Sequence, residues 1–178
     1  VSFGVVPGMV MYQLLNKSLS PQELGTGFET TEILKGFEFG MSFVPFVGMI
    51  IVLASAYRLA KFNIDIRQTE NFIGLPTPAN TLLIISLPLI FQYQYSPLIE
   101  HVIFNHWFLI TLTIVSSFLL NAEIKLFSLK FKTWDFNSNQ ARYIFLALSL
   151  LAIIILKFIA IPLIIVLYIL GSLLIKDK

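Results

Sequence analysis

The stretch 141–175 is almost wholly apolar and carries only two charged side chains. A membrane-spanning helix needs about 20 mostly apolar residues, so this stretch is too long for one span. Lys157 and Pro162 interrupt it, and a charge and a missing backbone N–H both disfavour an unbroken helix. We therefore predict two short helices, 142–156 and 159–175, joined by a tight hairpin. One long helix that is tilted or kinked is the alternative.

The composition of the whole chain is that of a membrane protein. Of its 178 residues, 57% are hydrophobic and 12% are charged, and the mean hydropathy is +0.84. Soluble domains are about half apolar and about a quarter charged, so this chain has too few polar residues to cover a soluble globule of its size. We predict an all-α fold, a polytopic transmembrane helix bundle that forms one domain over residues 1–178.

Six apolar segments are the candidate spans. The first is short, as a truncated helix would be, and the chain starts at Val1 already inside apolar sequence. We therefore expect the chain to be the C-terminal part of a larger membrane domain. The predicted spans are 1–15, 40–60, 78–93, 107–121, 142–156 and 159–175.

Basic side chains concentrate in alternate connections between these spans. Three lie from the last turn of the second span to the start of the third, four from the end of the fourth span to the first residue of the fifth, and two in the tail, which makes nine of the twelve Lys and Arg residues. By the positive-inside rule these segments are cytoplasmic. A five-span arrangement would move the tail to the other side and weaken the bias. The nine residues are Arg58, Lys61, Arg67, Lys125, Lys130, Lys132, Arg142, Lys176 and Lys178.

Composition and motifs disfavour several functions. The net charge of +2 is small and no basic run interleaves with aromatic residues, so nucleic-acid binding is not expected. The absence of cysteine excludes disulfides and thiolate metal sites. The sequence has no Walker loop, dinucleotide-binding fingerprint or nucleophile elbow. His101 and His106 fall in a predicted outside loop without a nearby carboxylate cluster, so no metal site is predicted there.

Arg58 and Lys61 are the first candidate binding residues. They lie three residues apart at the end of a predicted span, so they share one face of a helix. Two cations at a membrane surface suit a phosphate or carboxylate, which arginine can bind through two parallel hydrogen bonds. However, Lys and Arg at the end of a span commonly extend to the interface without binding a ligand. Position alone favours this second interpretation.

Two other features have a packing explanation beside a functional one. Asn80 falls about one turn into the third predicted span, where an amide can bond to a neighbouring helix or contact a ligand. Gly4 and Gly8 form a Gly-x-x-x-Gly pattern in the first span, which lets two helix backbones approach closely. Helix packing is the default interpretation of both.

Four segments of the chain resemble the phosphatidylserine synthases of the CDP-alcohol phosphatidyltransferase family. They occur in the order found in that family and are spread over most of the chain. Together they are specific, although each alone is a weak signal. The segments are SFGVVPG (2–8), SAYRLAKFN (55–63), RQTENFIGLPTPAN (67–80) and FSLKFK (127–132).

The resemblance implies an enzyme that transfers a phosphatidyl group from CDP-diacylglycerol to the hydroxyl of L-serine, giving phosphatidylserine and CMP. The family holds Mg or Mn with the pattern Asp-x2-Asp-Gly-x2-Ala-Arg-x8-Gly-x3-Asp-x3-Asp, and this chain does not contain it. In the family, the last Asp precedes the segment that resembles residues 2–8. We therefore expect this chain to begin just after the catalytic carboxylates, to carry no catalytic or metal-binding residue, and to be inactive alone. Six spans here and two upstream would fit the eight-helix arrangement of the family.

The resemblance also bears on the site residues. It favours a substrate-binding role for Arg58, followed by Lys61, Asn63 and Asn80, without assigning serine or nucleotide to any of them. It implies a homodimer in a bacterial inner membrane, with the active face toward the cytoplasm. Another acceptor alcohol, such as glycerol phosphate or inositol, is one alternative. A non-enzymatic membrane module, such as part of a transporter, is the other.

Overall fold

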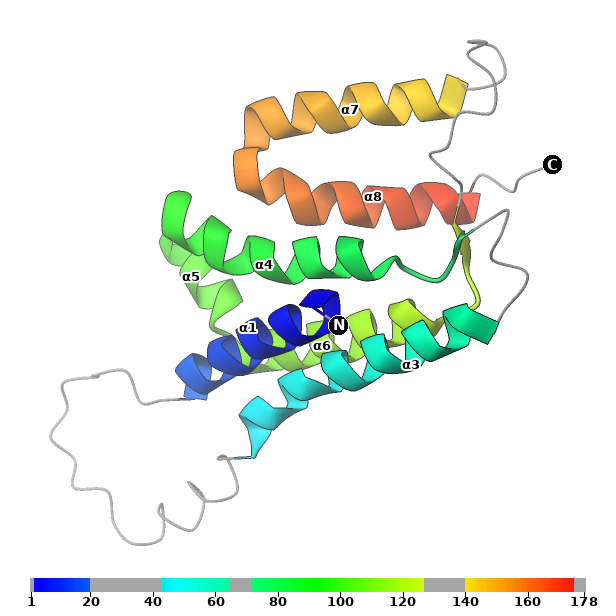
Figure 1. Ribbon diagram of the computed structural model, residues 1–178. Helices are drawn as coiled ribbons and strands as arrows, with labels where there is room; N and C mark the ends of the chain where they lie inside the picture. Colours follow the sequence, from blue (N-terminus) through cyan, green and yellow to red (C-terminus); the bar gives the residue numbers. More distant parts are fainter. Residues whose placement is uncertain (1, 20–42, 65–71, 127–139, 175–178) are drawn as a thin grey trace, which may run out of the picture.

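The computed structural model describes residues 2–19, 43–64, 72–126 and 140–174. Its long elements are all helices, as predicted for an all-α fold, and the described part adds one pair of two-residue strands (Figure 1). The elements are α1 (Ser2–Leu19), the 3-10 helix η1 (Val44–Met49), α3 (Ile50–Ile64), β1 (Phe72–Ile73), α4 (Thr77–Tyr93), α5 (Pro97–Ile103), α6 (His106–Asn121), β2 (Lys125–Leu126), α7 (Gln140–Leu156), η3 (Lys157–Ile159) and α8 (Ala160–Leu174).

Some of the sequence predictions lie outside the described residues. These are the ends of three predicted spans, part of one segment and the whole of another that carry the family resemblance, and five of the basic residues. They comprise residues 1, 40–42 and 175, the segments 67–71 and 127–132, and Arg67, Lys130, Lys132, Lys176 and Lys178.

The longer helices run roughly side by side and alternate in direction (Figure 1). At one end of the bundle, where α3 and α6 finish and α4 begins, β1 pairs antiparallel with β2, with Phe72 opposite Leu126 and Ile73 opposite Lys125. We call this the strand end. At the opposite end, α4 finishes, α5 follows and α6 begins, and we call this the α5 end.

Local sequence explains where two of the helices start. α4 follows Pro76 and has Pro78 in its first turn. Backbone N–H groups of the first turn have no acceptor within the helix, so a proline there costs no helical hydrogen bond. α6 is capped by Asn105, whose side-chain oxygen accepts hydrogen bonds from the backbone N–H groups of Trp107 at 2.9 Å and Phe108 at 3.3 Å. The predicted segments 78–93 and 107–121 thus match α4 and α6 closely.

Glycines let α1 pack tightly against η1 and α3. A Cβ on Gly4 would lie 2.7 Å from Ser55 Cβ, and one on Gly8 would lie 2.4 Å from Val52 Cγ2. From the other side, a Cβ on Gly48 would lie 2.7 Å from the backbone nitrogen of Tyr12. These distances leave no room for a side chain, so the Gly-x-x-x-Gly pattern serves helix packing, as predicted.

The apolar stretch at the end of the chain forms a helical hairpin. Lys157 has a φ of 52°, a left-handed conformation that ends the regular run of α7. The rings of Phe145 on α7 and Tyr168 on α8 come within 5.8 Å of each other. Two residues this far apart along one continuous helix would be separated by about 35 Å. The prediction of two helices joined by a tight turn is therefore confirmed, and the alternative of one long helix is not.

Gln94, just after α4, holds the turn of this hairpin. Its Nε2 donates to the carbonyl of Leu156 at 3.0 Å, and its Oε1 accepts from the backbone N–H of Ile159 at 3.1 Å. Beside it, the rings of Tyr93 and Phe158 stack with centroids 5.2 Å apart. The side-chain amide of Gln94 thus forms one hydrogen bond with the backbone of Leu156 and another with that of Ile159, at a turn where the regular hydrogen bonding of the α-helix is interrupted.

The structure supports fewer spans than the six predicted. By length and composition, two helical stretches of the described chain could cross a membrane, Val44–Asn63 and Arg142–Ser172, or three if the bent pair α5–α6 counts as one. The second stretch is the hairpin folded at Lys157. By comparison, α4 and α6 have 17 and 16 residues. They rise about 24–26 Å, less than the roughly 30 Å of a bilayer core.

Candidate site at the strand end

Arg58 is the central residue of the candidate site. It lies on the second half of α3, is only 9% exposed, and reaches away from the solvent. Its Nη1 donates to the carbonyl of Leu120 in the last turn of α6, and its Nη2 donates to the carbonyl of Gly74 at 3.3 Å. Carbonyls at a helix C-terminus lack intrahelical partners and carry partial negative charge, so a cation is stabilised there.

Gly74 makes room for this guanidinium. Its φ is +75°, in the left-handed region that glycine adopts without strain, and a Cβ there would lie 2.7 Å from both Arg58 Nη1 and the carbonyl oxygen of Leu120. Its N–H donates to the carbonyl of Ile124 at 2.8 Å, and that of Leu75 donates to the carbonyl of Leu119 at 2.9 Å. The turn before α4 is therefore fixed to the end of α6 by its own backbone.

The same face of α3 makes two further contacts with the end of α6. The Nδ2 of Asn121 donates to the carbonyl of Ala54 at 3.2 Å. The Nζ of Lys61 lies 3.3 Å from the Oε1 of Glu123. Ala54, Arg58 and Lys61 are spaced by four and three residues, so they form one stripe along the helix. The predicted shared face of Arg58 and Lys61 is confirmed, whereas the pairing of Lys61 with Glu123 was not predicted.

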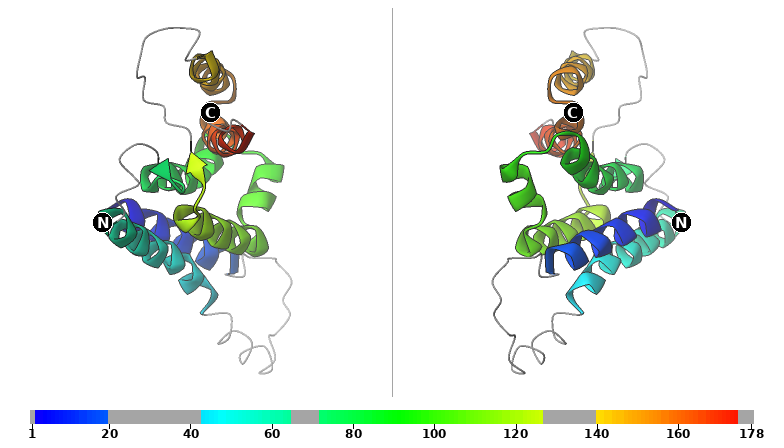
Figure 2. Two further views of the ribbon diagram at one scale, coloured as in Figure 1. Left: turned by 90° about the vertical axis from the view of Figure 1, so that its right-hand side faces the viewer. Right: turned by 90° about the vertical axis from the view of Figure 1, so that its left-hand side faces the viewer.

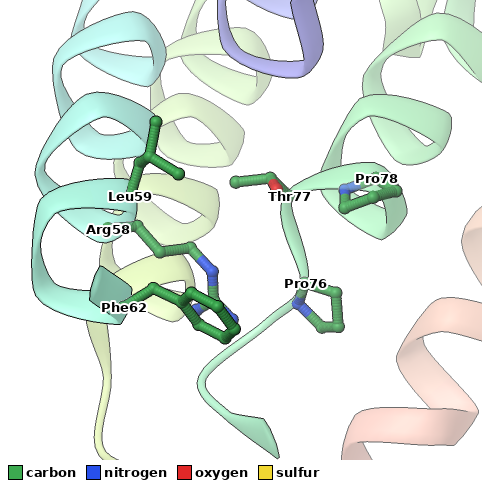
Figure 3. Close-up of a pocket in the computed structure, with 6 residues that line it drawn as sticks. All are labelled: Arg58, Leu59, Phe62, Pro76, Thr77 and Pro78. Carbon is green, nitrogen blue, oxygen red and sulfur yellow. The ribbon is translucent and has the colours of Figure 1, made fainter. Parts of the chain in front are cut away.

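A cavity of about 230 Å³ opens beside Arg58. Arg58 and Phe62 extend into this region from α3 toward Pro76, at the start of α4 (Figure 3). The residues that line the cavity are Arg58, Leu59, Phe62, Pro76, Thr77 and Pro78.

A second cavity of about 240 Å³ adjoins the first, because Leu59 and Thr77 line both. It runs between α1 and α3, and its other lining residues are Phe3, Gly4, Val5, Val52, Ser55 and Ala56. We call the two cavities together the Arg58 groove. From Phe62 to Val52 the groove follows α3 for about 15 Å. One end is cationic and the remainder is largely apolar.

Among the described residues, no acidic side chain pairs with Arg58. In the described part of the chain, the ion pair at this end joins Lys61 to Glu123, and Arg58 bonds only to backbone carbonyls. A buried charge without a counter-ion costs several kcal/mol, of which hydrogen bonds to carbonyls recover a part. The groove therefore favours a ligand whose anionic group sits beside this guanidinium.

Asn80 is fully buried. Neither its Nδ2 nor its Oδ1 has a hydrogen-bond partner among the described residues. Next to it, the hydroxyl of Thr81 donates to the carbonyl of Phe3 at 2.6 Å and so ties α4 to α1. Buried side-chain amides are almost always hydrogen-bonded. A buried amide without a protein partner therefore indicates that water or a ligand binds to it.

The structure brings together only some of the predicted site residues. Arg58 lines the groove, but Lys61, Asn63 and Asn80 are not among the residues that line either cavity. Phe62 and Thr77 also line the groove and were not predicted from the sequence. The first could have been found from its spacing of four residues from Arg58, which places both on one helix face.

The resemblance implies Mg or Mn held by acidic side chains. Over the described residues, no group of three or more His, Cys, Asp or Glu side chains comes together. His101 lies on α5 and His106 begins α6, which corrects the loop expected there. The described residues do not fit a divalent metal site, so no chemical step is assigned here to a metal.

Comparison with known proteins returned no match. No protein-family model, no curated protein and no solved structure matches this chain. The features of the chain that bear on its function are therefore the Arg58 groove and the four segments that carry the family resemblance.

Proposed function

We propose that this chain belongs to an integral membrane enzyme of the CDP-alcohol phosphatidyltransferase type. The enzyme transfers a phosphatidyl group from CDP-diacylglycerol to the hydroxyl of L-serine and releases CMP. In this proposal the protein lies in a bacterial inner membrane, and the strand end, with Arg58 and Lys61, faces the cytoplasm. The basic residues of that end match the expected excess of positive charge on the cytoplasmic side.

The observation that carries the proposal is the Arg58 groove. It joins a buried guanidinium, which has no acidic partner among the described residues, to an apolar channel along α3. This combination suits an amphiphile, with a phosphate at the cation and hydrocarbon along the helix. A guanidinium binds phosphate oxygens through parallel hydrogen bonds, which fixes orientation as well as charge. A groove in the outer surface of a membrane bundle also lets such a lipid enter from the bilayer.

In the proposed reaction, the serine hydroxyl oxygen attacks the phosphorus that bears diacylglycerol. A new P–O bond to serine forms, the P–O bond to CMP breaks, and the hydroxyl proton passes to a base. In this proposal, the base and the metal-binding carboxylates lie outside the described residues. The described residues of the groove bind the lipid phosphate and hold it at the strand end, where water-soluble serine and CMP can exchange. Lys61, Asn63 and Asn80 stay candidate substrate-binding residues.

Blocking the groove tests this role without touching the bonds of Arg58. Leu59→Trp places a bulky ring where the two cavities meet, and Leu59 is half exposed, so the core need not move. In the complete gene product that contains this chain, we expect the KM for CDP-diacylglycerol to rise about tenfold, equivalent to about 1.4 kcal/mol of binding. The measurement is CMP release in detergent–lipid micelles.

The matched control is Leu53→Trp, an equally large change at an exposed position of α3 outside the groove. It should leave the KM unchanged. Equal KM values for both variants and the unmodified enzyme would remove the groove from lipid binding. CMP release with glycerol phosphate or inositol, but not with serine, would keep the enzyme family and change the acceptor.

A further inference from the structure

The short helix α5 does not follow the long axis of the bundle. It is bent by 59° relative to α6, and Figure 2 shows it running between the ends of α4 and α6, across the direction of the longer helices. With 7 residues it rises only about 10 Å, which is too short to cross a bilayer. It closes the α5 end of the bundle, opposite the Arg58 groove (Figure 1).

Two faces of α5 are apolar, but only one of them is covered by protein. Ile99 and Ile103 share the face that packs against the core, and Ile103 is 4% exposed. Leu98 and Val102 are four residues apart and share the neighbouring face, where they are 78% and 48% exposed. The second apolar face is thus left without a protein neighbour in the described chain.

The remaining face of α5 is polar. His101 is exposed, and Glu100 accepts a hydrogen bond from Tyr95 Oη at 2.6 Å. This hydrogen bond to the Glu100 carboxylate raises the pKa of Tyr95. Tyr95 and Trp107, which flank the helix, are both exposed. Tyrosine and tryptophan are enriched where a bilayer meets water.

We propose that α5 is an interfacial helix that lies in the boundary between lipid headgroups and acyl chains. Leu98 and Val102 face the acyl chains, while Glu100 and His101 face the headgroups and water. A helix divided between an apolar and a charged side takes this position in a membrane. The inference rests on the proposed membrane location of the chain and is independent of its proposed chemistry.

Two other placements of α5 fit the observations less well. As the first half of a broken span continued by α6, α5 would carry Glu100 and His101 into the hydrocarbon, where an acidic side chain costs about 2.5–3.5 kcal/mol. As a contact for a second protein, its exposed face offers two aliphatic side chains and no small residue that would let another helix approach closely.

Spin labels can locate each face, because the chain has no cysteine of its own. Leu98→Cys, Val102→Cys and His101→Cys are each labelled with a nitroxide in protein reconstituted into phosphatidylcholine vesicles. Collisions with lipid-soluble oxygen and with a water-soluble nickel chelate are then measured. Leu150→Cys, on an exposed apolar position of α7, serves as the control for deep hydrocarbon.

We expect the ratio of oxygen to nickel accessibility at Leu98→Cys and Val102→Cys to fall between those of Leu150→Cys and His101→Cys. A ratio equal to that of Leu150→Cys would make α5 part of a span. High nickel accessibility at Leu98→Cys would place the face in water, and low accessibility to both reagents would indicate a protein contact. Each of these three results overturns the inference. If Leu150→Cys itself lacks oxygen accessibility, the membrane location fails instead.

Discussion

At the scale of single residues, Gly74 decides whether Arg58 can reach the end of α6. Replacing it with alanine puts a Cβ 2.7 Å from Arg58 Nη1 at a φ of +75°. We expect Gly74→Ala to lower the free energy of unfolding by about 1–3 kcal/mol, measured by thermal unfolding in detergent. Gly74→Asn is the matched variant, because asparagine tolerates the left-handed backbone but carries the same Cβ. A stable Gly74→Asn protein would show that backbone strain, and not crowding of Arg58, sets the requirement.

Asn80 carries the second prediction at this scale. Its buried amide has no partner among the described residues, and an unmade hydrogen bond of this kind costs about 1–3 kcal/mol. Asn80→Leu keeps a similar branched shape and removes that amide, so we expect it to raise the free energy of unfolding. We also expect it to lower CMP release, because residues that bind a substrate are often not the most stable choice at their position. A less stable variant would mean that water satisfies the amide. Full activity would exclude the ligand role of Asn80.

At the scale of elements, Gln94 should hold the α7–α8 hairpin against the bundle. Gln94→Ala leaves the carbonyl of Leu156 and the N–H of Ile159 without their partner. We expect a loss of about 1–3 kcal/mol and faster amide hydrogen exchange at Ile159. Gln92→Ala removes the same side chain two residues earlier, at an exposed position of α4, and should change neither quantity. Equal rates of amide hydrogen exchange at Ile159 in both variants would show that apolar contacts alone hold the hairpin against the bundle.

Local elements were also the part of the structure that the sequence predicted best. The apolar runs located α4 and α6 to within about one residue, and Lys157 marked the turn of the hairpin. The prediction failed for α5, because a short helix with Glu100 and His101 has the composition of a loop. It also counted too many spans, because apolar runs such as 78–93 and 107–121 are themselves shorter than the roughly 20 residues that a span needs.

At the scale of the whole molecule, the contacts of the candidate site could not be predicted. Arg58 meets Leu120, and Lys61 meets Glu123, across 62 positions of sequence in each case. Helical periodicity shows that Arg58 and Lys61 share a face, but it does not show which distant element that face contacts. The sequence therefore indicated a cation for an anionic ligand, and the fold added the apolar groove beside it.

The proposed lipid synthase activity can be measured directly on the complete gene product that contains this chain. The purified protein is incubated in micelles with CDP-diacylglycerol, a divalent cation and L-serine, and both products are quantified by mass spectrometry. We predict that phosphatidylserine and CMP form in equal amounts and only when serine is present. If neither product forms with serine or with any other acceptor alcohol, the enzyme proposal is wrong, and the Arg58 groove belongs to a membrane protein without this activity.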